Sequence, residues 1–303
     1  MPSELPARVH LVEVGPRDGL QNEPEHIPTD RKVAFIRKLC AAGLPTVEAT
    51  SFVHPKAIPQ LADSGDVMAN LGDTGAVEIM ALVPNAKGLE RAIASGLKRI
   101  AVFTAASDAF TRKNINMSVA ESLDTFAPVV ERAMATGMSV RGYVSTAFVC
   151  PYAGEIDKRV VRDVCDKLRQ MGCDEIAVSD TIGAAAPRDI FATVGHVLES
   201  IDVGNVALHL HDTFGTALAN VYAGLELGVA RFDASAGGLG GCPYAKGASG
   251  NLATEDLVYF LDRMGIETGV SLNRVFEASS YIAETLGRPL PSRQWQRLRA
   301  ACG

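Results

Sequence analysis

Two histidines, His209 and His211, end a short apolar run that reads VALHLH over residues 206–211. If this run is a β-strand, both side chains point to the same face, because successive side chains alternate between faces. Two imidazoles on one face can hold a divalent cation, whereas core histidines each need a hydrogen-bond partner. We interpret the pair as metal ligands, with two hydrogen-bonded core histidines as the alternative.

Further polar side chains lie at the ends of other apolar runs. Arg17 and Asp18 follow the run at 9–14, and Asn251 ends a glycine-rich segment. Asp18 and Asn251 can add two oxygen ligands to the imidazoles, a set that suits Mg²⁺ or Mn²⁺. Arg17 can stabilise negative charge that develops on a substrate oxygen, or it can serve only as a structural ion pair.

Glu48 lies inside a predicted strand, where an unpaired carboxylate is costly to bury. It is therefore either a structural partner for Arg17 or a group that tunes the metal from behind its ligands.

The segment GGLGGCPYAKGASGN at 237–251 is rich in glycine and carries one thiol, Cys242. A mobile loop of this kind can close over a site and deliver an acid or a nucleophile. The alternative is a flexible loop with an incidental cysteine. It is not a phosphate-binding P-loop, because the GxxxxGK[ST] spacing is missing.

The chemistry needs elements that bring these residues together, and short apolar runs alternate with helical patterns along the chain. Eight strands are predicted, at 9–14, 46–50, 78–83, 99–104, 139–147, 175–180, 206–211 and 231–236. Helical patterns follow at 29–43, 59–70, 85–96, 118–136, 155–171, 187–201, 216–228 and 254–264. Eight such units predict an α/β fold, a (β/α)8 TIM barrel, with a doubly wound open sheet as the alternative. In a barrel the candidate residues meet at the carboxyl ends of the strands.

The remaining segment, from about 265, carries another helical pattern at 271–287. We expect extra helices packed on the barrel, so that residues 1–303 form one catalytic domain.

Composition excludes several classes of protein. The net charge of −6 leaves no general basic surface for a nucleic acid, so no nucleic-acid partner is expected. No apolar run approaches the ~18 residues that cross a membrane, and no secretory signal is present. The six cysteines form no CxxC pair. We expect a reduced, cytoplasmic protein without a membrane partner.

Six motifs together resemble the 3-hydroxy-3-methylglutaryl-CoA lyases, a family within the metal-dependent barrel lyases and synthases. They are VEVGPRDGLQNE, SFV, KNINMS, SDTIG, HLHDTFG and GLGGCPYAKGASGN. The resemblance spans residues 8 to 286 approximately. The cysteine loop is specific to the lyase branch, whereas the RDG and HxH elements are shared more widely.

The resemblance implies a role for each candidate residue. Metal ligands are implied at Asp18, His209, His211 and Asn251; catalytic residues at Cys242, Arg17, Glu48, Asp180 and His209; and substrate-binding residues at Arg17, Gln21, Ser51, Thr181 and Asn114.

The implied reaction is a metal-dependent retro-Claisen cleavage of 3-hydroxy-3-methylglutaryl-CoA to acetyl-CoA and acetoacetate, with Mg²⁺ or Mn²⁺ as cofactor. A homodimer acting on this acyl-CoA in leucine degradation and ketone-body formation is also implied. Departures beside the motifs, such as Ala49, leave open a related 3-hydroxyacyl-CoA such as citramalyl-CoA. A Claisen-type synthase, a metal-dependent hydrolase and a barrel that only binds a CoA ester are weaker alternatives.

Overall fold

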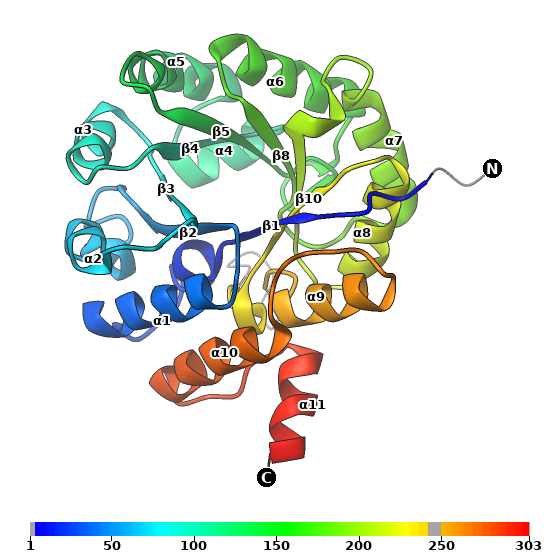
Figure 1. The fold of residues 1–303 in the computed structure, drawn as a ribbon. Helices are drawn as coiled ribbons and strands as arrows, with labels where there is room; N and C mark the ends of the chain where they lie inside the picture. The colour runs from blue at the N-terminus through cyan, green and yellow to red at the C-terminus, as the bar shows by residue number, and fades with distance from the viewer. Residues whose placement is uncertain (1–3, 242–249, 303) are drawn as a thin grey trace.

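Eight parallel strands close into a barrel in the computed structural model, which describes residues 4–241 and 250–302. The strands are β1 (His10–Glu13), β2 (Thr46–Ser51), β3 (Glu78–Leu82), β4 (Arg99–Ala105), β5 (Ser139–Ser145), β8 (Glu175–Asp180), β9 (Val206–Leu210) and β10 (Arg231–Ala234). Their order around the barrel is β1-β10-β9-β8-β5-β4-β3-β2 (Figure 1). The predicted barrel is confirmed, and the open sheet is wrong because β1 pairs with both β10 and β2.

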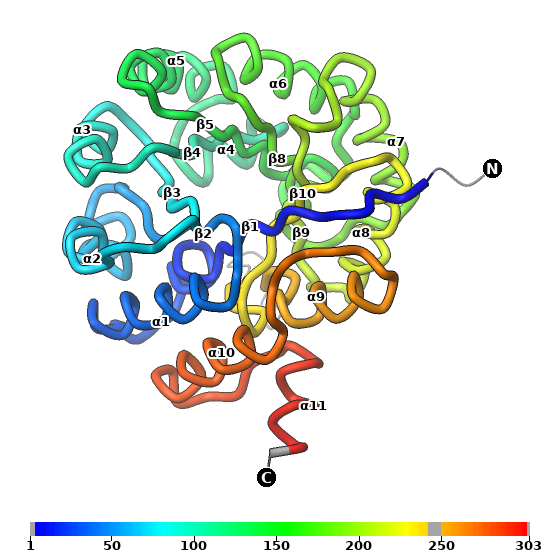
Figure 2. The backbone as a smooth tube through the Cα atoms, viewed as in Figure 1, coloured from blue at the N-terminus to red at the C-terminus, as the bar shows by residue number. Residues whose placement is uncertain are grey.

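Helices surround the barrel on its outside, as the tube in Figure 2 shows. They are α1 (Thr29–Ala41), α2 (Ser64–Leu71), α3 (Ala86–Ala94), α4 (Asp108–Ile115), α5 (Val119–Ala135), α6 (Lys158–Met171), α7 (Pro187–Val197), α8 (Ala217–Glu226) and α9 (Thr254–Arg263). The predicted extra helices are α10 (Leu272–Leu286), which packs on α1 and α9, and α11 (Arg293–Cys302), which packs on α9 and α10. Among the described residues, none of these helices has the length and apolar character to cross a membrane.

The barrel interior holds an apolar layer between two polar ends. Val12, Met80, Ala101, Ala177 and Ala207 are buried and cluster inside the barrel. A second, larger cluster fills the space between the strands and the outer helices. Because the apolar layer occupies the middle, charged side chains on the strands gather above and below it.

Several short elements were not predicted, among them the 3-10 turns η3 (Val203–Asn205) and η4 (Ala236–Gly238) and the three described next. Helix α4 has only eight residues; Ser107 caps its start and Asn116, with φ of 57°, ends it. A small hairpin follows β5, formed by β6 (Val149–Cys150) and β7 (Gly154–Glu155). The third is a π-helical turn, η1 (Gly15–Gly19), directly after β1. Elements this short have too few residues to show a hydrophobic period in the sequence.

Candidate active site

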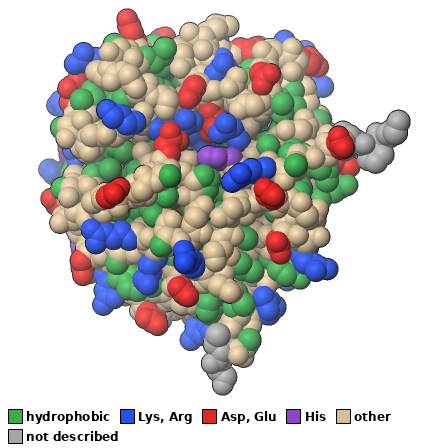
Figure 3. Space-filling model, in the orientation of Figure 1, with side chains coloured by type: hydrophobic (Ala, Val, Ile, Leu, Met, Phe, Trp, Pro, Cys, Tyr) green, Lys and Arg blue, Asp and Glu red, His purple; other side chains and the backbone are tan. Residues whose placement is uncertain are grey.

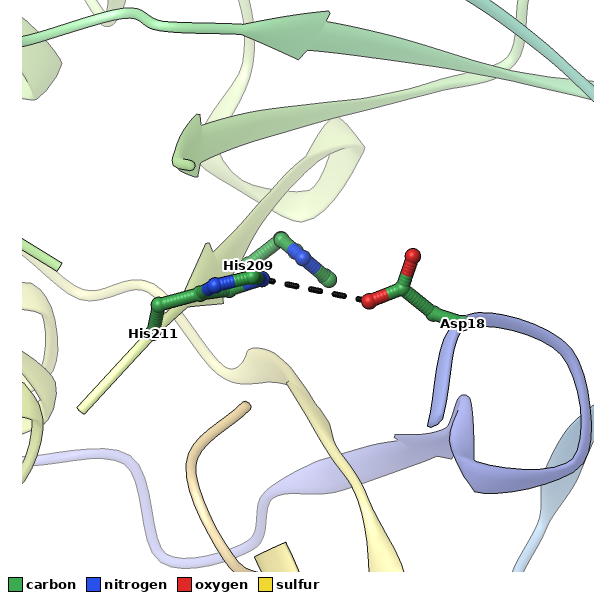
Figure 4. Close-up of side chains that lie close together, drawn as sticks. All are labelled: Asp18, His209 and His211. Atoms are coloured by element: carbon green, nitrogen blue, oxygen red, sulfur yellow. Dashed lines mark ion pairs between the residues drawn. The ribbon is translucent and has the colours of Figure 1, made fainter. Parts of the chain in front are cut away.

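Asp18, His209 and His211 converge at the end of the barrel where the strands finish. Each offers one ligand atom, and these atoms lie within 4.8 Å of one another. Nε2 of His211 is 3.8 Å from Oδ2 of Asp18. Figure 4 shows the two histidines on the strand end facing the loop that carries Asp18. The predicted juxtaposition of the HxH pair with the strand 1 carboxylate is therefore present in the structure.

The turn η1 aims Arg17 and Asp18 into the mouth of the barrel. The backbone N–H groups of Asp18 and Gly19 both donate to the carbonyl of Val14, at 2.8 and 3.2 Å, which folds the chain back tightly after β1. A Cβ on Gly19 would lie 2.9 Å from Leu239 Cβ, so only glycine allows this turn to pack on the segment after β10. The GPRDG motif thus fixes the direction of both charged side chains.

Arg17 links two carboxylates at the mouth. Its Nε donates to Oε2 of Glu48 and its Nη1 to Oδ1 of Asp18, each at 2.6 Å. Burial alone would lower the pKa of Arg17, but the carboxylates of Glu48 and Asp18 outweigh it and raise that pKa. For Asp18 the balance is reversed: burial would raise its pKa, but Arg17 and the two histidines outweigh burial and lower that pKa. Asp18 is therefore ionised and available as a ligand.

The two histidines differ in their surroundings and in their hydrogen-bond partners. Burial, reinforced by the neighbouring His209, lowers the pKa of His211 to about 4, so its imidazole is neutral near pH 7. Its Nδ1 is buried and has no hydrogen-bond partner among the described residues. Nδ1 of His209 lies 3.0 Å from Oδ2 of Asp233 on β10. Two imidazoles, of which that of His211 is neutral near pH 7, beside an ionised carboxylate suit a divalent cation, so these residues fit a metal.

Asn251 is brought to the same place by the backbone. The segment 250–253 runs beside the end of β9, with an isolated bridge between His211 and Asn251. Nδ2 of Asn251 donates to Oδ2 of Asp18 at 2.8 Å and to the carbonyl of Leu239 at 3.1 Å. The predicted ligand is thus in position, but in this arrangement its amide nitrogen rather than its oxygen faces Asp18.

Glu48 is completely buried on β2. Its Oε2 accepts from Arg17 and lies 3.4 Å from the hydroxyl of Tyr143, whereas its Oε1 has no partner among the described residues. Burial raises the pKa of Glu48, which Arg17 opposes. Both roles left open by the sequence remain compatible with this geometry, because Arg17 connects Glu48 directly to Asp18.

Asp180 and Thr181 shape the loop after β8. The carboxylate of Asp180 accepts the backbone N–H groups of Ala184 and Ala185, both at 3.0 Å. Burial raises the pKa of Asp180 to about 6, although these backbone N–H groups oppose the shift. Oγ1 of Thr181 accepts from the backbone N–H of Thr146 at 2.7 Å. Both side chains therefore have a structural task besides any catalytic one.

The remaining predicted residues differ in how near they come to the ligand cluster. Nε2 of Gln21 donates to Oδ1 of Asp18 at 3.1 Å. Ser51 is buried and donates to the carbonyl of Leu82 at 3.2 Å, and Asn114 is exposed on α4. Cys242 lies outside the described residues.

Sequence reasoning missed three residues beneath the cluster: Asp233, Arg141 and Tyr143. Nη2 of Arg141 donates to Oδ1 of Asp233 at 2.5 Å, and its guanidinium lies 4.8 Å from the centroid of the Tyr143 ring. Burial would raise the pKa of Asp233, but Arg141 outweighs it and lowers that pKa. A signal was available, since Arg141 and Asp233 are charged residues inside predicted barrel strands, as Glu48 is.

Taken together, the mouth offers a cation site beside a buried guanidinium. A divalent ion there would be held by a carboxylate and two imidazoles, and three protein ligands would leave coordination positions for a substrate. Arg17 uses two of the ~5 N–H donors of a guanidinium for its hydrogen bonds to Glu48 and Asp18. Such an arrangement suits a substrate with adjacent oxygen atoms, on one of which negative charge develops.

Comparisons with known proteins agree with this arrangement. The sequence model of the family described as HMGL-like matches residues 8–282. A rat protein named hydroxymethylglutaryl-CoA lyase, mitochondrial, is 50% identical over 289 residues, covering 95% of this chain and 89% of the relative. A second rat protein, 3-hydroxy-3-methylglutaryl-CoA lyase, cytoplasmic, is 47% identical over 291 residues, covering 96% of this chain and 85% of the relative. The crystal structure of hydroxymethylglutaryl-CoA lyase from Pseudomonas aeruginosa has a TM-score of 0.96 at 46% identity, covering 98% of this chain and 99% of the other.

Proposed function

The chain belongs to the HMGL-like family, and from this premise we propose that it cleaves 3-hydroxy-3-methylglutaryl-CoA to acetyl-CoA and acetoacetate. It is a carbon–carbon lyase, as are relatives about half identical to it over nearly the whole chain. The observation that carries the proposal is the convergence of Asp18, His209 and His211 beside Arg17 at the barrel mouth.

We propose that Asp18, His209, His211 and Asn251 would hold the metal, Asn251 through its amide oxygen. A bound Mg²⁺ or Mn²⁺ would supply Lewis acidity and would orient the substrate's oxygens. Asp18 is held ionised by Arg17, and His211 stays neutral, so neither ligand must first lose a proton near pH 7.

The residues of the chain divide the proton and charge transfers of the reaction. The carboxylate of Asp18 is the candidate base for the C3 hydroxyl proton, because both ring nitrogens of His209 are occupied once Nδ1 bonds Asp233 and Nε2 binds the ion. As the C3 carbonyl forms, the C2–C3 bond breaks and its electron pair moves into the thioester enolate. The guanidinium of Arg17 stabilises the enolate oxygen, and the thiol of Cys242 then protonates C2 to give acetyl-CoA.

For the other predicted residues we propose supporting roles. Glu48 and Gln21 hold Arg17 and Asp18 in place, as their hydrogen bonds indicate. Asp180 and Thr181 shape the loop after β8, the strand that pairs with β9. Ser51 is fully buried and holds the end of β2 through Leu82, and the exposed Asn114 on α4 contacts the acyl-CoA.

The test is release of acetoacetate from 3-hydroxy-3-methylglutaryl-CoA, measured with Mg²⁺, with Mn²⁺ and with excess chelator. We expect metal-dependent release, lowered in His211→Ala by about 10³-fold, which corresponds to the loss of roughly 4 kcal/mol of metal-derived stabilisation. We expect Cys242→Ala to lose about 10²–10⁴-fold, the usual contribution of an acid or base. His196→Ala, a surface histidine on α7 paired with Glu199, is the matched control and should retain full activity. A metal-loaded protein that releases acetoacetate no faster than buffer would overturn the proposed substrate; citramalyl-CoA is then the next thioester to test.

We further propose that the protein acts as a cytoplasmic homodimer in leucine degradation and ketone-body formation. Relatives carry both mitochondrial and cytoplasmic names, so the compartment is a separate question from the chemistry. Sedimentation of the purified chain tests the dimer, and localisation of the tagged protein in its own cell tests the compartment.

A further inference from the structure

Behind His209 lies a line of buried polar groups that none of the proposed chemical steps uses. Asp233 and His209 are partners in the register of β10 and β9, and Oδ2 of Asp233 lies 3.0 Å from Nδ1 of His209. Oδ1 of the same carboxylate accepts from Nη2 of Arg141 at 2.5 Å. Asp233 is 1% exposed and Arg141 is fully buried. The two oxygens of one carboxylate are thus divided between one imidazole and one guanidinium.

We propose that Asp233 and Arg141 are positioning residues that fix the tautomer of His209, so that its Nε2 keeps a lone pair for the metal. The inference rests on the proposed metal centre. A carboxylate bound to a guanidinium offers only acceptors, so Nδ1 of His209 must carry the hydrogen in this contact. In a neutral imidazole the other nitrogen is then the free acceptor, and a carboxylate behind a metal-bound histidine has this effect elsewhere.

Arg141 is itself held from two sides, which is why it can fix the carboxylate. Its Nε lies 3.2 Å from Oε1 of Glu175 at the start of β8. Its guanidinium lies over the ring of Tyr143, whose centroid is 5.8 Å from that of the His209 ring in an edge-on arrangement. Contacts therefore run without a break from the beginning of the barrel strands to the histidine at their end.

The geometry predicts which tautomer of His209 the Asp233→Asn variant will have. Arg141 can only donate, so the amide oxygen of the new side chain must turn toward Arg141. The amide NH₂ then faces Nδ1 of His209, which must become an acceptor, and the hydrogen moves to Nε2. The imidazole keeps its position but loses the lone pair that faces the ligand cluster. A change from aspartate to asparagine acts in this way in other carboxylate–histidine pairs.

Two measurements on the full-length protein test the inference. ¹⁵N spectra of the histidine side chains in chelator-treated protein report the tautomer, with the His209 signal assigned as the one missing from His209→Gln. Titration with Mn²⁺, followed by the EPR signal of the free ion, reports metal affinity without substrate. We expect hydrogen on Nδ1 in the wild type and on Nε2 in Asp233→Asn, with Mn²⁺ affinity lowered about 10–100-fold.

The matched control is Asp63→Asn. This substitution also removes a carboxylate paired with a buried cation, because Oδ1 of Asp63 accepts from Nζ of Lys32 at 2.8 Å. Asp63, however, lies outside the barrel. It should leave the tautomer and the Mn²⁺ affinity unchanged.

Results that contradict the positioning role differ from the result that contradicts the metal centre. Unchanged tautomer and affinity in Asp233→Asn overturn the positioning role. If that variant does not fold, the wild-type spectrum decides, because hydrogen on Nε2 of His209 overturns the inference by itself. A wild-type protein that does not bind Mn²⁺ overturns the metal centre of the proposed function instead.

Discussion

The two ends of the barrel are both rich in charge, but they use it differently. Figure 1 views the barrel from the end where the strands begin, and Figure 3 shows acidic and basic side chains around a histidine near the middle of that face. There Glu175 lies between three arginines, with N–O distances of 3.3 Å to Arg99, 3.0 Å to Arg231 and 3.2 Å to Arg141. At the opposite end the carboxylate of Asp18 faces His209 and His211 instead, and burial lowers the pKa of His211 to about 4.

The difference shows which end can do chemistry. At the first end the carboxylates of Glu78, Asp174 and Glu175 each lie within 4 Å of an arginine nitrogen, so these charges neutralise one another and hold the strands in place. At the mouth, one potential ligand atom from each of Asp18, His209 and His211 lies within 4.8 Å of the others, and Nδ1 of His211 and Oε1 of Glu48 have no hydrogen-bond partner among the described residues. Hydrogen bonds from Arg17, Gln21 and Asn251 stabilise the carboxylate of Asp18, and the low pKa of His211 leaves its imidazole able to bind a cation.

Among the substitutions that test this contrast between the two ends, the largest effect is expected from removing the arginine of the mouth. Arg17→Gln should lower kcat about 10²–10³-fold, because a neutral amide stabilises the developing enolate charge far less than a guanidinium does. Steady-state release of acetoacetate under saturating metal and substrate measures this loss. A kcat within threefold of the wild type would show that the charge at this end is structural, as at the other end, and the contrast between them would disappear.

A smaller effect, on the free energy of unfolding rather than on kcat, is expected at the end where the strands begin. Arg99 pairs with Glu175, Asp174 and Glu78, and its side chain is 11% exposed. Arg99→Gln should lower the free energy of unfolding by about 1–3 kcal/mol, since a buried carboxylate loses one of its cations. Urea denaturation measures this change, and kcat at a temperature well below the transition should stay within twofold of the wild type. A tenfold fall in kcat of the folded variant would mean that this end also contributes to catalysis.

The sequence predicted the residues at the barrel mouth better than the buried residues beneath them. The eight strands were recognisable as short apolar runs between helical patterns, and the barrel rule then placed Arg17, Asp18 and the HxH pair at one end. The contact between Arg141 and Asp233 depends on side chains 92 positions apart that meet only inside the closed barrel. No local period encodes such a contact, although two charged residues in buried strands were a reason to look for one.

Local geometry was the other gap. The direction of Arg17 and Asp18 depends on the π-helical turn η1, in which the N–H groups of Arg17, Asp18 and Gly19 all donate to the carbonyl of Val14. This turn was not predicted, because the contacts that require its glycines come from elsewhere: a Cβ at Gly19 would lie 2.9 Å from Leu239 Cβ, and one at Gly15 would lie 2.6 Å from Oε1 of Glu13.

The smallest effect sharpens the comparison just outside the mouth, at a carboxyl group on the outer face of β1 whose described hydrogen-bond partners include no arginine. Glu13 is fully buried; its Oε1 accepts the N–H groups of Gly15 and Ala236, both at 2.8 Å, and its Oε2 lies 2.6 Å from Oγ1 of Thr254. Burial raises the pKa of Glu13 to about 7, although these hydrogen bonds oppose the shift.

Because the folded protein binds this proton more tightly than the unfolded chain, whose pKa is near 4.5, the contribution is complete below pH 4.5. It is lost as the pH rises to about 7, at no more than about 1.4 kcal/mol per pH unit. Glu13→Gln keeps the hydrogen bonds of the protonated acid and should flatten this decline. Urea unfolding in chelator at several pH values between 4.5 and 7 measures the slope, and Glu131→Gln, an exposed change on α5, controls for the lost charge. Equal slopes in the wild type and Glu13→Gln would mean that Glu13 is ionised in the folded protein, with its buried carboxylate stabilised by two backbone N–H groups and the Thr254 hydroxyl instead of an arginine.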